Sequence, residues 1–175
     1  IIDQPAALTL CEGLDATFHV KAEGEKVTYQ WQSSQGGSAW TPVPGATGAT
    51  LVLRNIKPAQ QNYQYRVVVS GACGSITSEP AKLSVDLKPV IVQQPVSVTT
   101  CDGAEASFQA GATGESLTYQ WQINDGSDNW KDLAGETSNS LTIKAAKSQN
   151  GYFYRVLVTG PCGTVTSVKA FAWAQ

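Results

Sequence analysis

The sequence predicts an all-β chain that folds as two tandem antiparallel β-sandwiches. Apolar and polar residues alternate with the period of two that half-buried strands require, as in Ala16–Val20, Tyr29–Gln32 and Tyr65–Val69. Clusters of Gly and Pro, such as Pro42–Gly45 and Gly71–Gly74, interrupt these strands at short intervals. Helical periodicity is absent, so we expect about seven short strands in each sandwich.

An internal repeat that accounts for the whole chain predicts the division into two sandwiches. Residues of the first half recur 90 positions later up to Leu51 and 89 positions later from Tyr65 onward. We therefore predict one module at residues 1–86 and a second at 87–175. The junction Val85–Pro89 is too short to act as a free tether, and Pro89 stiffens it, so we expect a semi-rigid connection.

Composition excludes several classes of partner. A formal charge of -2 provides no basic field for phosphate backbones, so we expect no nucleic acid partner. No apolar run approaches the roughly 18 residues of a membrane helix, so we expect no membrane insertion. The first ten residues lack the features of a signal peptide, and we expect the chain to be a segment of a longer protein.

The tryptophans are expected to serve the fold. Trp31 and Trp121 lie in alternating strands, where a large ring is far more often core than binding site. Trp40 and Trp130 follow glycine-bearing hairpins, and we expect them to pack half exposed at the edge of the core.

The repeated residues resemble the immunoglobulin superfamily, intermediate set. The runs QPxxxTxC(E/D)G, TYQWQ and YRVxVxGxCG also resemble Ig-like repeats that bacterial secreted and cell-surface proteins string together. The resemblance implies a core signature made of Trp31, Tyr65, Trp121 and Tyr154. It implies adhesion or display roles as well. Valine and alanine stand where the family's disulfide between strands B and F would be.

Four cysteines, one pair in each module, indicate an oxidising compartment, either extracellular or at the cell surface. Since a repeated unit should be self-contained, the favoured pairing joins Cys11 to Cys73 and Cys101 to Cys162. The resembled topology places Cys11 and Cys73 at opposite ends of a sandwich, which conflicts with that pairing. A second pairing therefore stays open, in which Cys11 bonds to Cys162, leaving Cys73 and Cys101 for neighbouring modules.

The sequence predicts no catalytic residues, no cofactor and no metal ligands. The single histidine, His19, is replaced by Gln109 in the second copy, and the acids are scattered. One oxygen-rich run, Asn124–Asn129, suits calcium, but the favoured interpretation is a hairpin in which Asp125-Gly126 forms the turn.

The two copies differ on one predicted face, which we expect to contact a ligand or partner. If Trp121 and Tyr154 point inward, alternation exposes a set of polar, apolar and aromatic side chains on the second module: Gln120, Gln122, Phe153, Arg155, Leu157, Phe171 and Trp173. A bulge that turns Phe171 and Trp173 into the core, with Ala172 and Ala174 facing out, is an equal alternative.

These observations favour a non-catalytic adhesion or spacer module of a secreted or cell-surface protein that contacts proteins or glycans. Its expected partners include neighbouring modules of a longer parent protein. The alternative is a carbohydrate-binding accessory module of a secreted glycoside hydrolase, and a small hydrolase is the third reading.

Overall fold

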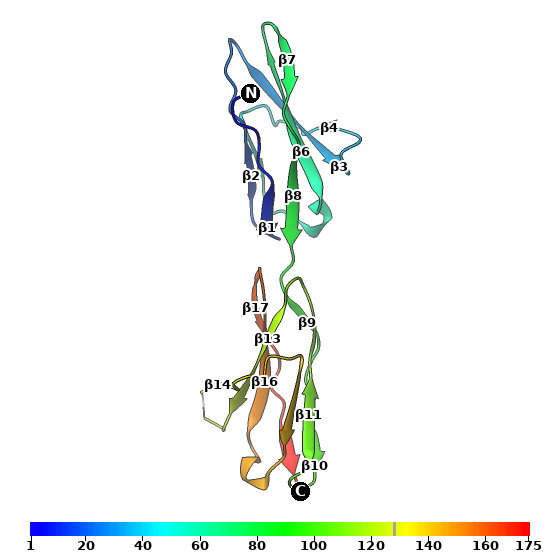
Figure 1. Cartoon of the computed structure of the whole chain (residues 1–175), viewed down its shortest axis with the longest axis vertical. Coiled ribbons are helices and arrows are strands. Elements are labelled where there is room, and N and C mark those ends of the chain that lie inside the picture. The colour runs from blue at the N-terminus through cyan, green and yellow to red at the C-terminus, as the bar shows by residue number, and fades with distance from the viewer. Residues whose placement is uncertain (128) are drawn as a thin grey trace. The chain divides into compact units, whose positions relative to one another are not determined.

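The structure is a computed structural model that describes residues 1–127 and 129–175. The chain separates into two compact units, Ile1–Asp86 and Leu87–Gln175, which we call unit 1 and unit 2. Both units are built from β-strands in mainly antiparallel sheets, so the predicted all-β fold is confirmed (Figure 1). Among the described residues, no helix has the length and apolar character needed to cross a membrane.

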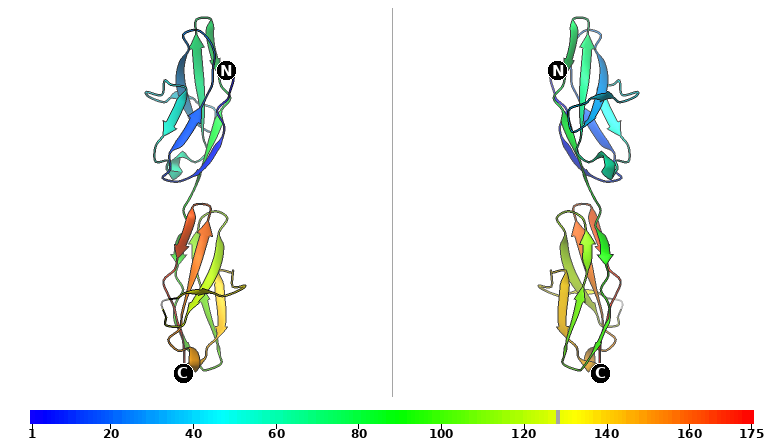
Figure 2. Two further views of the ribbon diagram at one scale, coloured as in Figure 1. Left: turned by 90° about the vertical axis from the view of Figure 1, so that its left-hand side faces the viewer. Right: turned by 90° about the vertical axis from the view of Figure 1, so that its right-hand side faces the viewer.

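Unit 1 is a sandwich of two sheets. One sheet has the order β1-β8-β6-β3-β4, with β7 also paired to β6, and the other consists of β2 and β5 (Figures 1 and 2). The pairing of β1 with β8 is parallel, whereas the remaining pairs are antiparallel. The elements of unit 1 are β1 (Leu8–Cys11), β2 (Ala16–His19), β3 (Thr28–Gln35), β4 (Thr41–Pro42), β5 (Thr50–Leu53), the 3₁₀ turn η1 (Pro58–Gln60), β6 (Tyr63–Gly71), β7 (Gly74–Thr77) and β8 (Ala81–Asp86).

Unit 2 repeats this arrangement. Its main sheet has the order β14-β13-β16-β17, and β11 pairs with β15 in the opposite layer. Strand β10 pairs in parallel with β18, and β9 pairs with β12. The elements of unit 2 are β9 (Val90–Gln93), β10 (Val98–Thr100), β11 (Glu105–Gln109), β12 (Gly111–Thr113), β13 (Thr118–Asn124), β14 (Lys131–Asp132), β15 (Ser140–Lys144), the 3₁₀ turn η2 (Lys147–Gln149), β16 (Phe153–Gly160), β17 (Gly163–Thr166) and β18 (Ala172–Ala174).

The interior of each unit is centred on one tryptophan. Trp31 is fully buried, and its indole N–H donates a hydrogen bond of 2.9 Å to the carbonyl oxygen of Gly48. The Phe18 ring lies between Trp31 and Tyr65, with centroid separations of 6.4 and 5.0 Å. This cluster satisfies the one polar atom of the indole and packs both sheets around aromatic rings.

The same cluster recurs in unit 2. The buried Trp121 indole donates a 2.9 Å bond to the carbonyl oxygen of Ser138, and Phe108 lies 6.2 Å from Trp121 and 5.1 Å from Tyr154. Burial raises the pKa of the Tyr154 hydroxyl, and it does the same for Tyr65 in unit 1. Both tyrosines therefore stay neutral across the physiological pH range.

Apolar pairs stand where antibody domains hold their central disulfide. Val20 and Val67 in unit 1 are fully buried, and so are Ala110 and Val156 in unit 2. Each sandwich is therefore held together by packing, without a covalent bond through its centre.

Candidate functional site

The outer face of unit 2 exposes two aromatic side chains near the end of the chain. Phe171 is 38% exposed and Trp173 is 46% exposed, whereas Ala172 is only 6% exposed. The backbone of Ala170 pairs with Tyr154 through hydrogen bonds of 2.7 and 2.8 Å, and both of these residues are buried. This pairing fixes the alternation, so the aromatic residues face solvent and the alanines fill the core.

Gln122 departs from the prediction that it is exposed. Its side chain leaves β13 on the side opposite Trp121, yet only 9% of the residue is exposed. Its Oε1 accepts a 2.7 Å bond from Arg155 Nε, and its Nε2 donates a 2.7 Å bond to Asp132 Oδ1. The guanidinium of Arg155 in turn lies 4.1 Å from the centroid of the Trp130 ring. Long neighbouring side chains cover the Gln122 amide. The side chain therefore points away from the core and is nevertheless buried.

This arrangement of glutamine, arginine and tryptophan is shared by the two units. In unit 1, Arg66 Nε donates a 2.8 Å bond to Gln32 Oε1, and the guanidinium lies 4.2 Å from the Trp40 ring centroid. Trp40 and Trp130 are both partly buried. Because both copies hold it, we assign this stack to the fold.

The hydrogen bonds made by the Gln120 side chain also recur in unit 1. Its Nε2 donates to the carbonyl oxygens of Trp121 and Leu133 at 2.9 and 2.8 Å. Gln30 makes the equivalent bonds to Trp31 and Val43 at 2.9 and 3.0 Å. The amide thus ties β13 to the segment after β14 and is not presented to a ligand.

A hollow of about 270 Å³ opens on the outer face of unit 2 beside the partly buried ring of Phe153. The Lys169 ammonium lies 4.2 Å from the centroid of the Phe153 ring. Unit 1 has neither the aromatic ring nor the ammonium at the equivalent positions, with Gln64 in place of Phe153 and Pro80 in place of Lys169. The hollow is lined by Asn124, Gly126, Ser127, Trp130, Phe153 and Lys169.

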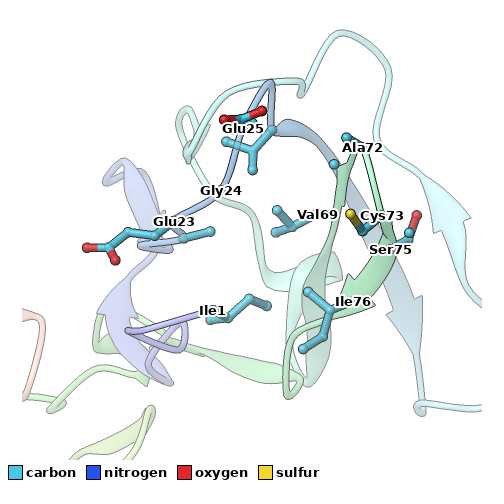
Figure 3. Close-up of a pocket in the computed structure, with 13 residues that line it drawn as sticks. Ile1, Glu23, Gly24, Glu25, Val69, Ala72, Cys73, Ser75 and Ile76 are labelled. Carbon is cyan, nitrogen blue, oxygen red and sulfur yellow. The ribbon is translucent and has the colours of Figure 1, made fainter.

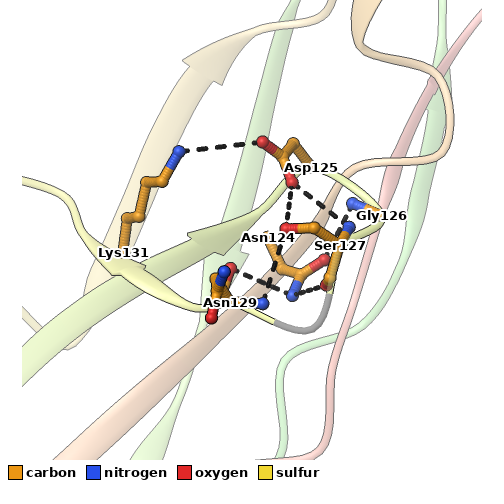
Figure 4. A network of polar contacts seen from close by, with 6 residues as sticks. All are labelled: Asn124, Asp125, Gly126, Ser127, Asn129 and Lys131. Atoms are coloured by element: carbon orange, nitrogen blue, oxygen red, sulfur yellow. Dashed lines mark hydrogen bonds and ion pairs between the residues drawn. The ribbon is translucent and has the colours of Figure 1, made fainter.

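Residues of the β13–β14 hairpin border this hollow and bond mainly to one another (Figure 4). Asp125 Oδ1 accepts bonds from the hydroxyl and backbone N–H of Ser127 at 2.6 and 3.2 Å. Its Oδ2 lies 3.8 Å from Lys131 Nζ. The hydrogen bonds from Ser127 lower the pKa of the Asp125 carboxyl below its ordinary value.

The hairpin interpretation of Asn124–Asn129 agrees with this network. Asn124 Oδ1 accepts a 2.8 Å bond from the Gly126 N–H, and its Nδ2 donates to two backbone carbonyls. Within residues 1–127 and 129–175, no group of three or more His, Cys, Asp or Glu side chains is placed to hold a metal ion. Asp128, part of the oxygen-rich run, lies outside the described residues.

Among the predicted contact residues, the side chains of Phe153, Leu157, Phe171 and Trp173 take part in none of the hydrogen bonds of the described residues, although the backbone of Phe171 bonds to Ser97 and Val98. Leu157 is partly buried and pairs across the sheet with Gln120 and Thr166. Sequence reasoning missed Lys169. Its even spacing from Phe171, two residues further along the segment that leads into β18, was the signal that places it on the same face.

The cysteines do not pair within each unit. Cys11 and Cys162 are disulfide-bonded, whereas Cys73 and Cys101 are exposed free thiols. The favoured expectation of a Cys11–Cys73 and a Cys101–Cys162 bridge is therefore wrong. In unit 1, Cys11 ends β1 beside Asp86, while Cys73 lies in the β6–β7 turn at the other end of the sandwich (Figure 1). A disulfide requires Cα atoms within about 7 Å, which this separation does not allow.

Curated relatives resemble the chain over nearly its whole length. Endoglucanase C of Cellulomonas fimi is 34% identical over 170 residues, which cover 95% of this chain and 15% of that protein. The Protein sidekick of Drosophila melanogaster is 26% identical over 172 residues, covering 93% of this chain and 8% of that protein. The chain thus spans a small part of these relatives.

Solved structures and a family model agree on the fold. The DIP-gamma IG1+IG2 structure superposes with a TM-score of 0.62 at 13% identity, covering 99% of this chain and 96% of that one. The I67–I69 fragment of titin gives a TM-score of 0.67 at 15% identity, covering 98% and 63%. Both show an Ig-like fold. A single family model matches residues 4–87 and again residues 93–171. The chain therefore belongs to the family described as a domain of unknown function, DUF8696.

Proposed function

We propose that the chain is a non-catalytic binding and spacer segment of a secreted or cell-surface protein, and that unit 2 makes the contact through its outer face. The observation that carries this proposal is the replacement of polar residues by apolar ones, of which Phe171 and Trp173 are exposed. Phe153, Phe171 and Trp173 stand where unit 1 has Gln64, Lys82 and Ser84. Grouped apolar exposure lowers solubility, and it is typical of surfaces that a partner covers.

The absence of assembled chemistry supports the non-catalytic part. The one histidine of the chain, His19, is exposed on β2, and its Nδ1 lies 3.3 Å from the hydroxyl of Thr50. In the part of the chain that the structure describes, no further hydrogen bond joins the imidazole to a third group, which a catalytic base would need for its orientation. Turnover of a nitrophenyl ester or glycoside by the purified chain, lost on His19→Gln, would overturn this part of the proposal.

The cysteines support the proposed location outside the cell, and the relatives support the proposed bacterial origin. Disulfide-bonded Cys11 and Cys162 fit an oxidising compartment. The match to a protein of Cellulomonas fimi supports a bacterial origin, and the intermediate-set type is part of the same proposal. We further propose that neighbouring modules of a longer parent protein are among the partners.

A second candidate function is glycan binding by an accessory module. The match to an endoglucanase, whose name describes cleavage within a glucan, favours it. A pyranose ring has apolar C–H faces that pack on aromatic rings, and hydroxyl groups that accept and donate hydrogen bonds. The hollow of unit 2 offers the partly buried Phe153 ring together with the Lys169 ammonium. These are the groups that such a ligand needs.

Replacing the aromatic residues by the residues of unit 1 tests the contact. We expect Phe153→Gln and Trp173→Ser each to weaken binding to soluble glucans by about tenfold or more, because each removes an apolar contact at the centre of the surface. Isothermal titration calorimetry and a glycan array measure the effect. The matched controls are Gln64→Ala and Ser84→Ala in unit 1, which should leave binding unchanged.

The outcomes separate the two candidates. Glucan binding that is unaffected by both substitutions contradicts the proposed face. If the unaltered chain binds no glycan on the array, the glycan reading fails. The contact with a protein partner then remains, and Trp173→Ser is the variant that should abolish it.

A further inference from the structure

The apolar surface of unit 2 continues from its outer face around one edge of the sandwich. Val168 is 54% exposed and Val96 is 74% exposed, and they stand where unit 1 has Glu79 and Ala6. We call the exposed apolar residues of this region the edge patch, and its members are Val96, Val168, Phe171 and Trp173. The edge patch thus adds aliphatic side chains to the two aromatic ones.

Hydrogen bonds hold the two segments of the edge patch side by side. Gln94 Oε1 accepts a 3.0 Å bond from the N–H of Val168. Ser97 Oγ accepts a 3.1 Å bond from the N–H of Phe171. Val96 lies between Gln94 and Ser97 in the sequence, so its segment runs alongside the one that carries Val168 and Phe171. Strands β10 and β18 continue the same pairing in parallel.

The edge patch adjoins the predicted contact face on β16. The backbone of Ala170 bridges to that of Tyr154 in antiparallel register, so Phe171 lies opposite Phe153. The Lys169 ammonium lies 4.2 Å from the centroid of the Phe153 ring. The edge patch and the aromatic residue of the hollow therefore form one continuous region of unit 2.

The edge patch is uncharged at two positions where unit 1 is charged. Glu79 and Lys82 of unit 1 correspond to Val168 and Phe171. Contacts between different proteins use complementary charges for rate and specificity, whereas a two-fold contact brings a charge close to its own copy. The replacement of both an acid and a base therefore suits a surface that meets itself. The formal charge of -2 on the whole chain adds little repulsion between copies.

The area of the edge patch is close to what one side of a stable dimer needs. With full surfaces of roughly 150–250 Å² per residue, the exposed fractions of its four residues amount to roughly 400 Å². A stable interface buries about 800 Å² on each partner, and a little over half of that area is apolar. The edge patch therefore supplies most of the apolar area for one side.

The chemistry of the edge patch favours a protein surface over a glycan. Valine and phenylalanine side chains have no hydrogen-bond groups, and the hydroxyl groups of a sugar need such partners. An apolar, uncharged surface is covered best by another apolar, uncharged surface of similar area.

We propose that the edge patch is the contact surface of a homodimer, in which unit 2 of one copy packs against unit 2 of a second copy about a two-fold axis. A second copy offers a surface of equal area and equal lack of charge, which selects it as the occupant. The homodimer rests on the proposed function, because it makes a second copy the partner of the outer face of unit 2. Since a two-fold contact closes on itself, association ends at the dimer.

Substitution by the residues of unit 1 tests this contact. All chains carry Cys73→Ser and Cys101→Ser, so that oxidation of the two exposed thiols forms no dimers. Sedimentation velocity over a range of concentrations measures the dissociation constant. We expect the parent chain to dimerise with a Kd on the order of micromolar, and Val168→Glu and Phe171→Lys each to raise it by about tenfold or more.

The matched control is Ile76→Glu in unit 1. Ile76 is also 54% exposed, and it lies with Ile1 and Val69 around a hollow of about 440 Å³ (Figure 3). We expect Ile76→Glu to leave the Kd unchanged, with far-UV circular dichroism confirming that every variant folds. A dimer that Ile76→Glu dissociates and Val168→Glu does not would place the contact on unit 1 and overturn the proposal.

Mixing the parent chain with a fluorescently labelled Phe171→Lys chain tests the symmetry. In a two-fold dimer each edge patch meets an edge patch, so the mixed dimer should be several-fold weaker than the parent dimer. In a head-to-tail contact the variant would still offer its unaltered surface to the parent's edge patch. A mixed dimer of full strength therefore contradicts the two-fold arrangement.

Two further outcomes overturn the homodimer. One is a parent chain that stays monomeric at about 1 mM, and the other is a dimer that neither Val168→Glu nor Phe171→Lys weakens. Failure of the proposed function gives a different result. A monomeric chain whose binding to a glucan is weakened by Trp173→Ser keeps the proposed contact face and loses only the homodimer.

Discussion

Units 1 and 2 have the same interior and different surfaces. Both bury a tryptophan whose indole bonds to a loop carbonyl, and both place an arginine over a second tryptophan. On the outer face they differ, because unit 2 has Phe171 and Trp173 where unit 1 has Lys82 and Ser84. Two copies in one chain thus act as a control for each other. Side-chain arrangements that recur in both units serve the fold, whereas surface residues that differ are candidates for contact with a partner.

The largest expected effect tests the shared interior. Trp31→Ala and Trp121→Ala should each destabilise their own unit by about 3–5 kcal/mol, because each leaves a cavity in a fully buried core. Urea denaturation, followed by the fluorescence of the remaining tryptophans, measures the loss. The control is Val96→Ala at a position that is 74% exposed. A loss near that of the control would mean that the tryptophan is not the centre of the core.

A smaller effect is expected from the shared arginine stack. Arg66→Ala and Arg155→Ala should each cost about 1–2 kcal/mol of unfolding free energy, since each loses a contact with a tryptophan ring and leaves a glutamine without its donor. The control is Arg54→Ala, whose ion pair with Asp15 is largely exposed. If Arg155→Ala lowered the unfolding free energy much more than Arg66→Ala, the arginine–tryptophan stacks of the two units would not be equivalent.

The smallest effect concerns the hairpin that only unit 2 stabilises with a carboxylate. Because Ser127 lowers the folded pKa of Asp125, the carboxylate contributes stability above its ordinary pKa of 3.8. That contribution is lost as the pH falls through the lower, folded value. NMR titration should therefore find a depressed pKa that Ser127→Ala raises toward the ordinary value. Unit 1 has Gln35 at this position, so its hairpin should not respond to acid in this way.

Alternation along the strands predicted the fold and the direction of most side chains. It placed Trp31, Tyr65, Trp121 and Tyr154 inside and Phe171 and Trp173 outside, with a bulge as the equal alternative for the last two. It failed for Gln122, because the period of a strand gives the side of the sheet and not the cover that long neighbouring side chains provide. Coverage depends on residues such as Asp132 and Trp130, which come from other segments.

The favoured cysteine pairing was wrong for a related reason, although the resembled topology had already placed Cys11 and Cys73 at opposite ends of a sandwich. Equal spacing of the cysteines in each copy favoured a bridge within the module, but spacing along the chain does not report the distance between the two ends of a sandwich. The pairing depends on how segments that are far apart in the sequence meet in space.

The apolar pairs at the centre of each sandwich also bear on chemical durability. The chain contains no methionine, and none of the residues that form the two cores is a cysteine. Peroxides attack the sulfur of methionine and cysteine first, so they find no such target in either interior. Oxidation of sulfur by peroxides is therefore directed to the exposed thiols of Cys73 and Cys101.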